Sequence, residues 1–221
     1  MNTNEKLVKL LEKSHFKCLK IERSYTSPAT KYTPSSCGTV RLKRMMQKPG
    51  IYRMEGVEGY DYYWHDEPIP ITSIIIDGKT WMVDDPLHWL GMQSLATHSE
   101  GTTLCAGLGL GLLQHALKAQ SKNFETIEIN SKVCELMSRF TPTQKIHNID
   151  FFQFERTGRK FAEYNTVVLD IWAGNKEEIR YSDMIAAYEM VKSKAPKSKV
   201  FIWGVKDEKY NPAVERMTLD I

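Results

Sequence analysis

Three glycines at alternate positions, Gly107, Gly109 and Gly111, stand in the stretch CAGLGLGLL. An apolar run typical of a buried strand precedes them, and a segment with the periodicity of a helix follows. Glycine permits positive φ angles and lets a ligand approach bare backbone. The start of the next helix offers unpaired N–H groups to an acceptor. This spacing therefore predicts a ligand-binding turn at the end of a strand.

The residues after the glycines narrow the class of ligand. A P-loop requires a Lys-Ser or Lys-Thr pair after its last glycine, but Leu112 and Leu113 follow here. A dinucleotide fingerprint requires a third glycine where Leu112 stands. The remaining pattern, G-x-G-x-G, resembles the first motif of class I methyltransferases that use S-adenosylmethionine. The alternative is a turn in which the glycines serve packing alone.

Three carboxylates follow later predicted strands and could complete such a site. Glu128 ends the next strand, in ETIEIN, where it could accept both ribose hydroxyls of the cofactor. Asp150 follows a third strand and could accept the adenine amino group, or it could cap a helix. Asp170 ends a fourth strand, in VVLDIW, and is the candidate that positions or deprotonates an acceptor.

Apolar residues beside these carboxylates could contact the same cofactor. We expect Ile129, Ile149 and Phe151 to sandwich the adenine ring. Leu108 lies within the glycine turn and is expected to line the cofactor site. Trp172, just past Asp170, is expected either to wall the active site or to pack into the core.

The elements that must position these residues alternate between strand and helix from about residue 84. We predict strands at 102–107, 124–129, 145–149, 165–172 and 198–205, and helices at 85–98, 112–120, 131–140 and 183–194. The strands are apolar with little alternation, as in parallel sheets covered by helices on both faces. This predicts a Rossmann-like α/β domain over 84–221 that binds ligands at the carboxyl ends of its strands.

Residues 1–83 predict a separate, smaller N-terminal region. Residues 4–14 have the pattern of an amphipathic helix, and 24–39 is rich in Ser, Thr and Pro, which predicts a loop or linker. Further along, ITSIIIDGKTWMVD places Asp77 and Gly78 between two apolar runs, which predicts a β-hairpin with a type I′ turn.

Four motifs extend the resemblance over about residues 70–205. In order and spacing, LCAGLGLGLL, IEIN, HNIDFFQF and VVLDIWAGN are similar to the motifs of the spermidine synthase branch of the methyltransferase-like superfamily. The resemblance implies a class I methyltransferase fold that binds S-adenosylmethionine or its decarboxylated form, with Asp170 at the catalytic and cofactor site. That family has two carboxylates after the fourth strand, whereas Ala173 takes the second position here. The segment after the last predicted strand is also shorter.

The preferred interpretation is a methyltransferase of unknown acceptor, with a small-molecule amine as one candidate. A polyamine aminopropyltransferase is the first alternative. A non-catalytic protein that keeps the cofactor-binding fold is the second alternative, because one substrate carboxylate is absent.

Charge and composition bear on partners and location. Residues 1–60 carry twelve Lys or Arg against five Asp or Glu, so nucleic acid is a candidate partner and a solvated basic face is the alternative. No apolar run approaches the roughly 20 residues that span a bilayer, and the start lacks a signal-peptide pattern. We therefore expect a cytoplasmic protein without membrane contact. A homodimer is one candidate for its oligomeric state.

The cysteines and histidines do not predict a metal site. The four cysteines include no C-x-x-C pair, and His88, His98 and His115 lack metal-ligand spacing.

Overall fold

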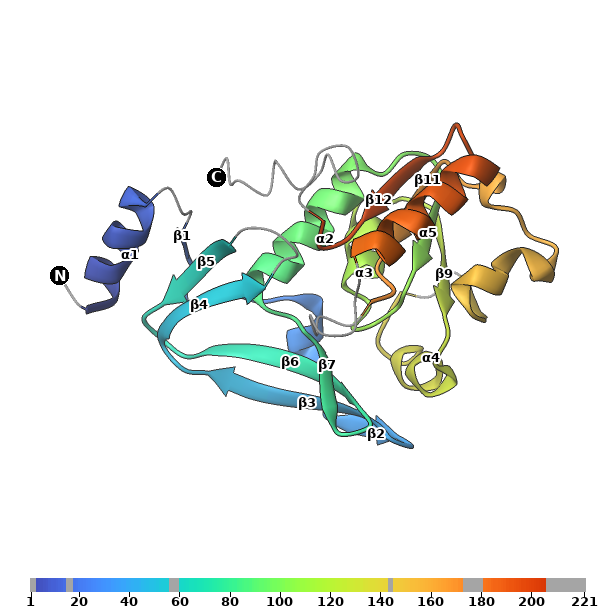
Figure 1. Cartoon of the computed structure of the whole chain (residues 1–221). Helices are drawn as coiled ribbons and strands as arrows, with labels where there is room; N and C mark the ends of the chain where they lie inside the picture. The colour runs from blue at the N-terminus through green and yellow to red at the C-terminus, as the bar shows by residue number, and fades with distance from the viewer. Residues whose placement is uncertain (1–2, 15–17, 56–59, 143–144, 173–180, 206–221) are drawn as a thin grey trace.

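The computed structural model describes residues 3–14, 18–55, 60–142, 145–172 and 181–205. A strand-rich N-terminal part packs against an α/β part that contains the glycine turn (Figure 1). No helix in these ranges is long and apolar enough to cross a membrane.

A parallel sheet forms the centre of the α/β part. Its strands are β8 (Thr103–Ala106), β9 (Phe124–Glu128), β10 (Ile146–Asn148), β11 (Thr166–Leu169) and β12 (Lys199–Ile202). Their order is β10-β9-β8-β11-β12, and every neighbouring pair is parallel. The chain passes outward from β8 to β9 and β10, then returns to β11 on the other side. The strand order therefore reverses between β8 and β11, where such sheets bind ligands.

Helices cover both faces of this sheet. They are α2 (Pro86–His98), α3 (Leu112–Ala119), α4 (Ser131–Met137) and α5 (Tyr181–Lys194), with the 3₁₀ helices η2 (Phe151–Thr157) and η3 (Phe161–Glu163). Cys105 packs into the core with α2, α3 and α4, whereas Leu104 and Ala106 pack into the core with η2, η3 and α5. The predicted mixed α/β architecture is thus confirmed, and it is compatible with a Rossmann-like fold.

The N-terminal part contains two smaller sheets. Its elements are α1 (Thr3–Lys13), β1 (Cys18–Lys20), η1 (Pro28–Lys31), β2 (Ser35–Cys37), β3 (Val40–Gln47), β4 (Gly50–Glu55), β5 (Tyr60–His65), β6 (Ile69–Ile76) and β7 (Lys79–Val83). The sheet orders are β2-β3-β6-β7 and β1-β5-β4. The predicted hairpin between β6 and β7 is confirmed, and both turn residues have positive φ, 51° at Asp77 and 79° at Gly78.

Two features of the N-terminal part differ from the sequence-based expectation. The predicted loop at 24–39 contains η1 and β2, and Ala29 and Tyr32 within it are buried. Strand β3 was not predicted, although Val40 and Leu42 are buried on one face. These buried residues join the core of α2, α3 and α4, so the N-terminal part shares a core with the α/β part.

Candidate functional site

The glycine turn connects β8 to α3 at the carboxyl edge of the parallel sheet. All three glycines have positive φ, 101° at Gly107, 49° at Gly109 and 69° at Gly111. Gly111 is the N-cap residue of α3, and the Gly107 N–H donates to the Ile127 carbonyl at 2.8 Å. The turn thus has the backbone shape that the sequence predicts, at the reversal point of the strand order.

Packing explains two of the glycines directly. A Cβ at Gly107 would overlap the backbone carbonyl of Asp170, and a Cβ at Gly111 would overlap the Thr141 side chain. At Gly109 the added Cβ would meet only the Met82 side chain, with its sulfur at 2.5 Å. Gly109 therefore faces a flexible side chain, whereas the other two positions are closed by less yielding neighbours.

Met82, on β7, is a contact that the sequence analysis missed. Its Sδ accepts the Leu110 N–H at 3.2 Å and lies against Gly109. The thioether thus covers part of the turn from the N-terminal part. No local pattern indicates this contact, because it depends on how β7 packs against α/β residues far along the chain.

Glu128 lies beside the glycine turn, at the end of β9. One carboxylate oxygen accepts the Leu108 N–H at 3.0 Å, and the other accepts the Asn130 N–H at 2.8 Å. Burial raises the pKa of Glu128 above its usual value, although these backbone donors oppose that rise. The Leu108 side chain is buried in the core, so Leu108 takes part in this arrangement through its backbone.

Asp170 follows β11 on the other side of the turn. Its N–H donates to the Ala106 carbonyl at 2.8 Å, which continues the pairing of β11 with β8. Burial, and then the charge of Glu128, raise the pKa of Asp170 to about 7. Within the described ranges, no hydrogen bond to the Asp170 carboxylate is found. Asp170 is thus a carboxyl group that can gain or lose a proton near neutral pH.

The predicted adenine-contacting residues divide between surface and core. Asp150 is the N-cap of η2 and accepts the Phe152 N–H at 2.9 Å, so the capping role is observed. Ile129 is 68% exposed, Ile149 is partly buried, and Phe151 is buried in the core at 3% exposure. Phe152 is 57% exposed instead. The exposed aromatic surface beside Asp150 therefore belongs to Phe152, which the sequence analysis did not select.

Three aromatic side chains lie near the carboxyl ends of β11 and β12. Trp172 is partly buried against the core beneath α5, which fits the packing alternative. His88, near the start of α2, stacks on Trp203 with ring centres 4.9 Å apart. The Trp203 N–H donates to the Leu169 carbonyl at 2.9 Å, so this stack lies close to Asp170 in the sheet.

His88 carries an unusual buried nitrogen. Its Nε2 is buried and has no hydrogen-bond partner among the residues that the structure describes. Burial lowers the pKa of His88 to about 4, so its imidazole is neutral at physiological pH. No sequence pattern indicated that His88 would stack on Trp203.

Some predicted features lie outside the described residues. Ala173, at the second carboxylate position of the related family, is one of them, and so is the short segment 206–221. In the part of the chain that is described, no group of three or more His, Cys, Asp or Glu residues could hold a metal ion.

No model of a known protein family matches this chain, and no curated protein sequence matches it. The geometry of the turn and its carboxylates is therefore the basis for assigning a function.

Proposed function

We propose that this protein binds S-adenosylmethionine and transfers its methyl group to an acceptor. The observation that carries the proposal is the meeting of three features at the strand reversal between β8 and β11. These are a turn of three positive-φ glycines, the Glu128 carboxylate against that turn, and the Asp170 carboxyl group beside it. The motif resemblance over residues 70–205 supports the choice of cofactor.

Glu128 is the residue that would hold the cofactor ribose. Each of its oxygens already accepts one backbone N–H, from Leu108 and from Asn130. The Gly109 and Ile129 backbone N–H groups also stabilise its ionised form, and its remaining acceptor capacity is available to hydroxyl donors. The hydrogen bonds to the backbone also fix the orientation of the carboxylate before a ligand arrives.

The adenine ring would lie further along the same edge, beside β10. One Asp150 oxygen accepts the Phe152 N–H, which leaves the second oxygen for the exocyclic amino group. The exposed side chains of Ile129 and Phe152 supply apolar and aromatic surface for the ring.

Asp170 is the proposed general base. When bound, the cofactor supplies an electrophilic carbon on a sulfonium, so the protein mainly has to align the acceptor with that carbon. A nearby cation favours the ionised carboxylate, which can then orient an acceptor amine or hydroxyl and take its proton. The His88–Trp203 stack would bound the site on the side of β12.

Calorimetric titration tests this proposal most directly. Wild-type protein and Glu128→Gln are titrated with S-adenosylmethionine, S-adenosylhomocysteine and decarboxylated S-adenosylmethionine. We expect the first two to bind the wild type and to bind Glu128→Gln weakly. Preference for the decarboxylated form would favour aminopropyl transfer, and absence of binding by all three would contradict the proposal and favour a non-catalytic role.

The acceptor is then sought with methyl-labelled cofactor and a panel of polyamines, small amines and nucleic acids. Transfer of label that is lost in Asp170→Asn would identify the acceptor class. If label is transferred equally by both proteins, the catalytic group lies elsewhere.

A further inference from the structure

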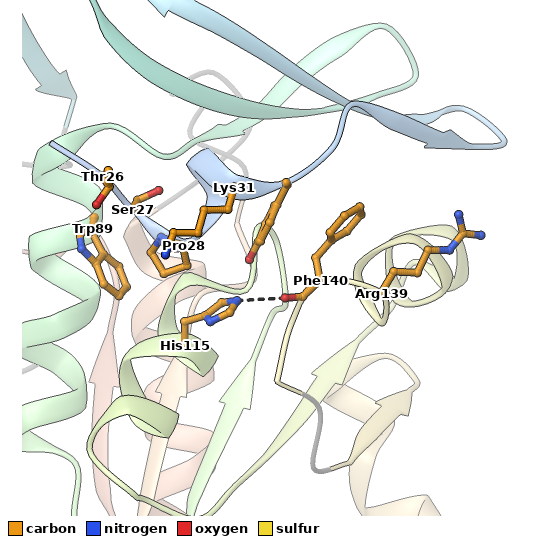
Figure 2. Close-up of a pocket in the computed structure, with 9 residues that line it drawn as sticks. Thr26, Ser27, Pro28, Lys31, Trp89, His115, Arg139 and Phe140 are labelled. Atoms are coloured by element: carbon orange, nitrogen blue, oxygen red, sulfur yellow. Dashed lines mark hydrogen bonds between the residues drawn. The ribbon is translucent and has the colours of Figure 1, made fainter. Parts of the chain in front are cut away.

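A cavity lies outside the proposed cofactor site, and its lining includes neither Glu128, nor Asp170, nor a glycine of the turn. It has a volume of about 540 Å³, opens to solvent, and is lined by residues of η1, α2, α3 and the segment after α4 (Figure 2). This volume is in the range of about 300–1,000 Å³ that is typical of small-molecule sites. The proposed function uses none of the side chains that line it.

Aromatic rings form much of the cavity wall. Tyr32 stacks on Phe140 with ring centres 4.9 Å apart and lies 6.1 Å from the His115 ring. Trp89 lines the cavity from α2. Tyr32 is only 4% exposed, so its ring is held by the core rather than free to move. This part of the wall is therefore fixed before any ligand binds, and the partly exposed rings of Trp89, His115 and Phe140 offer surface to a planar ring.

The charged groups at this cavity are cationic. Lys31 and Arg139 line it, and no Asp or Glu is among its described lining residues. Lys31 has no ion pair within the described part of the chain. Arg139 lies at the end of the cavity opposite Trp89 (Figure 2).

His115 is neutral in this surrounding. Its Nε2 lies 3.1 Å from the Phe140 carbonyl, which can only accept, so Nε2 carries the proton. Burial lowers the pKa of His115, and the Lys31 charge lowers it further. The cavity thus combines aromatic walls with an unneutralised lysine.

We propose that this cavity binds a nucleotide, with the base against the aromatic wall and the phosphate at Lys31. Base–aromatic stacking and lysine–phosphate attraction are the two interactions that this lining offers together. A free mononucleotide and a nucleotide within a single strand share this chemistry. The proposal does not depend on the proposed methyl transfer, because none of its residues belongs to that site.

The cavity is joined to the glycine turn through Tyr32. Its hydroxyl donates to the Leu110 carbonyl at 3.0 Å, within the turn. Thr141, which follows Phe140, packs against Gly111, the next residue of the turn. A ligand that contacts Tyr32 and Phe140 is therefore expected to alter the surroundings of the Leu110 and Gly111 amides.

Titration with uridine 5′-monophosphate tests the proposal without an adenine that could enter the cofactor site. Uridine and inorganic phosphate, the two parts of this nucleotide, are titrated separately. A short oligouridylate represents a nucleotide within a single strand. Lys31→Gln is compared with Lys118→Gln, which removes the same charge from an exposed position of α3 outside the cavity lining. Melting temperatures are measured for each variant.

We expect the monophosphate to bind at least tenfold more tightly than either half. Lys31→Gln should weaken it about tenfold, as loss of a charge-assisted phosphate contact does, and Lys118→Gln should leave it unchanged. Amide shifts at Leu110 and Gly111 should accompany binding, including in Glu128→Gln. Binding of the oligouridylate alone, with the same loss in Lys31→Gln, supports the site and identifies a strand as its source. No binding by either, or equal binding by the two lysine variants, overturns it.

Discussion

The pH dependence of cofactor binding tests the role of Asp170. Burial, and then the charge of Glu128, raise the pKa of this carboxyl to about 7. A sulfonium bound beside it would favour the ionised form and lower that pKa. The affinity for S-adenosylmethionine should therefore rise with pH, since less work is needed to ionise Asp170 before binding. S-Adenosylhomocysteine has a neutral thioether and should lack this contribution.

The size of the effect follows from the pKa of Asp170 in the free protein. If the bound cofactor returns this pKa to about 4, affinity should rise about 15-fold between about pH 5.5 and about pH 7. The expected release near about pH 6 is roughly one proton per cofactor bound, and it declines above about pH 7. The stability of the folded protein should have the opposite pH dependence. Asp170 ionises at lower pH in the unfolded chain than in the folded protein. The stability that it contributes is therefore present below about pH 4 and is lost as pH rises through about 7.

Calorimetry in buffers of different ionisation enthalpy measures both the affinity and the proton release. Asp170→Asn is the matched control, because it keeps the shape of the side chain and cannot ionise. The variant should bind both ligands with little dependence on this pH range, and its turnover should fall by roughly 100-fold or more. Equal pH slopes for the two ligands in wild type, or an unchanged slope in Asp170→Asn, would refute the assignment.

Three further predictions concern the glycine turn with Glu128 and the basic residues of β3. Glu128→Gln should weaken cofactor binding by about 10- to 100-fold, measured by calorimetry, through loss of charge-assisted hydrogen bonds to the ribose; a change below about twofold would exclude that role. Gly107→Ala should lower the free energy of unfolding by about 3 kcal/mol or more, because backbone blocks its Cβ, whereas Gly109→Ala should cost about 1 kcal/mol, since only a flexible side chain must move. Equal losses in chemical denaturation would contradict this difference. Nucleic acid binding through the basic N-terminal part should weaken steeply with salt and fall when Arg41 and Lys43 on β3 are both replaced by Gln. No binding at low salt would remove that hypothesis.

Strand substitutions are a better test of the basic region than deletion of its first forty residues. Ala29, Tyr32 and Val40 lie in the core shared with α2, α3 and α4. A deletion through these positions would remove core packing together with charge, so it could not separate the two effects.

The sequence by itself determined the α/β alternation and the place of the glycine turn. Apolar runs without alternation indicate strands buried on both faces, and chain order then places residues that end successive strands at one edge. The sequence therefore predicts that Gly107, Glu128 and Asp170 lie close together at one edge of the sheet. These inferences hold because they depend on local periodicity and on the few topologies that βα units allow.

Only the tertiary structure decided which side chains complete the site. Phe151 and Phe152 are the same residue type, so the sequence does not show which is exposed. The turn of η2 buries Phe151 and exposes Phe152. Met82 reaches the edge of the sheet from β7, and Trp203 just after β12 stacks on His88 of α2, so no local spacing could indicate either contact.

The cavity lined by Lys31 and His115 was also decided by the tertiary structure. Lys31 lies in a stretch whose composition predicted a loop, and His115 looked like one of several scattered histidines. They became neighbours because η1 packs on α3, with Tyr32 bonded to Leu110. The pKa of Asp170 also depends on burial and on Glu128, which the chain brings near only when β8, β9 and β11 pair. Periodicity sets the elements, whereas contacts between elements far apart in the chain set the chemistry of their side chains.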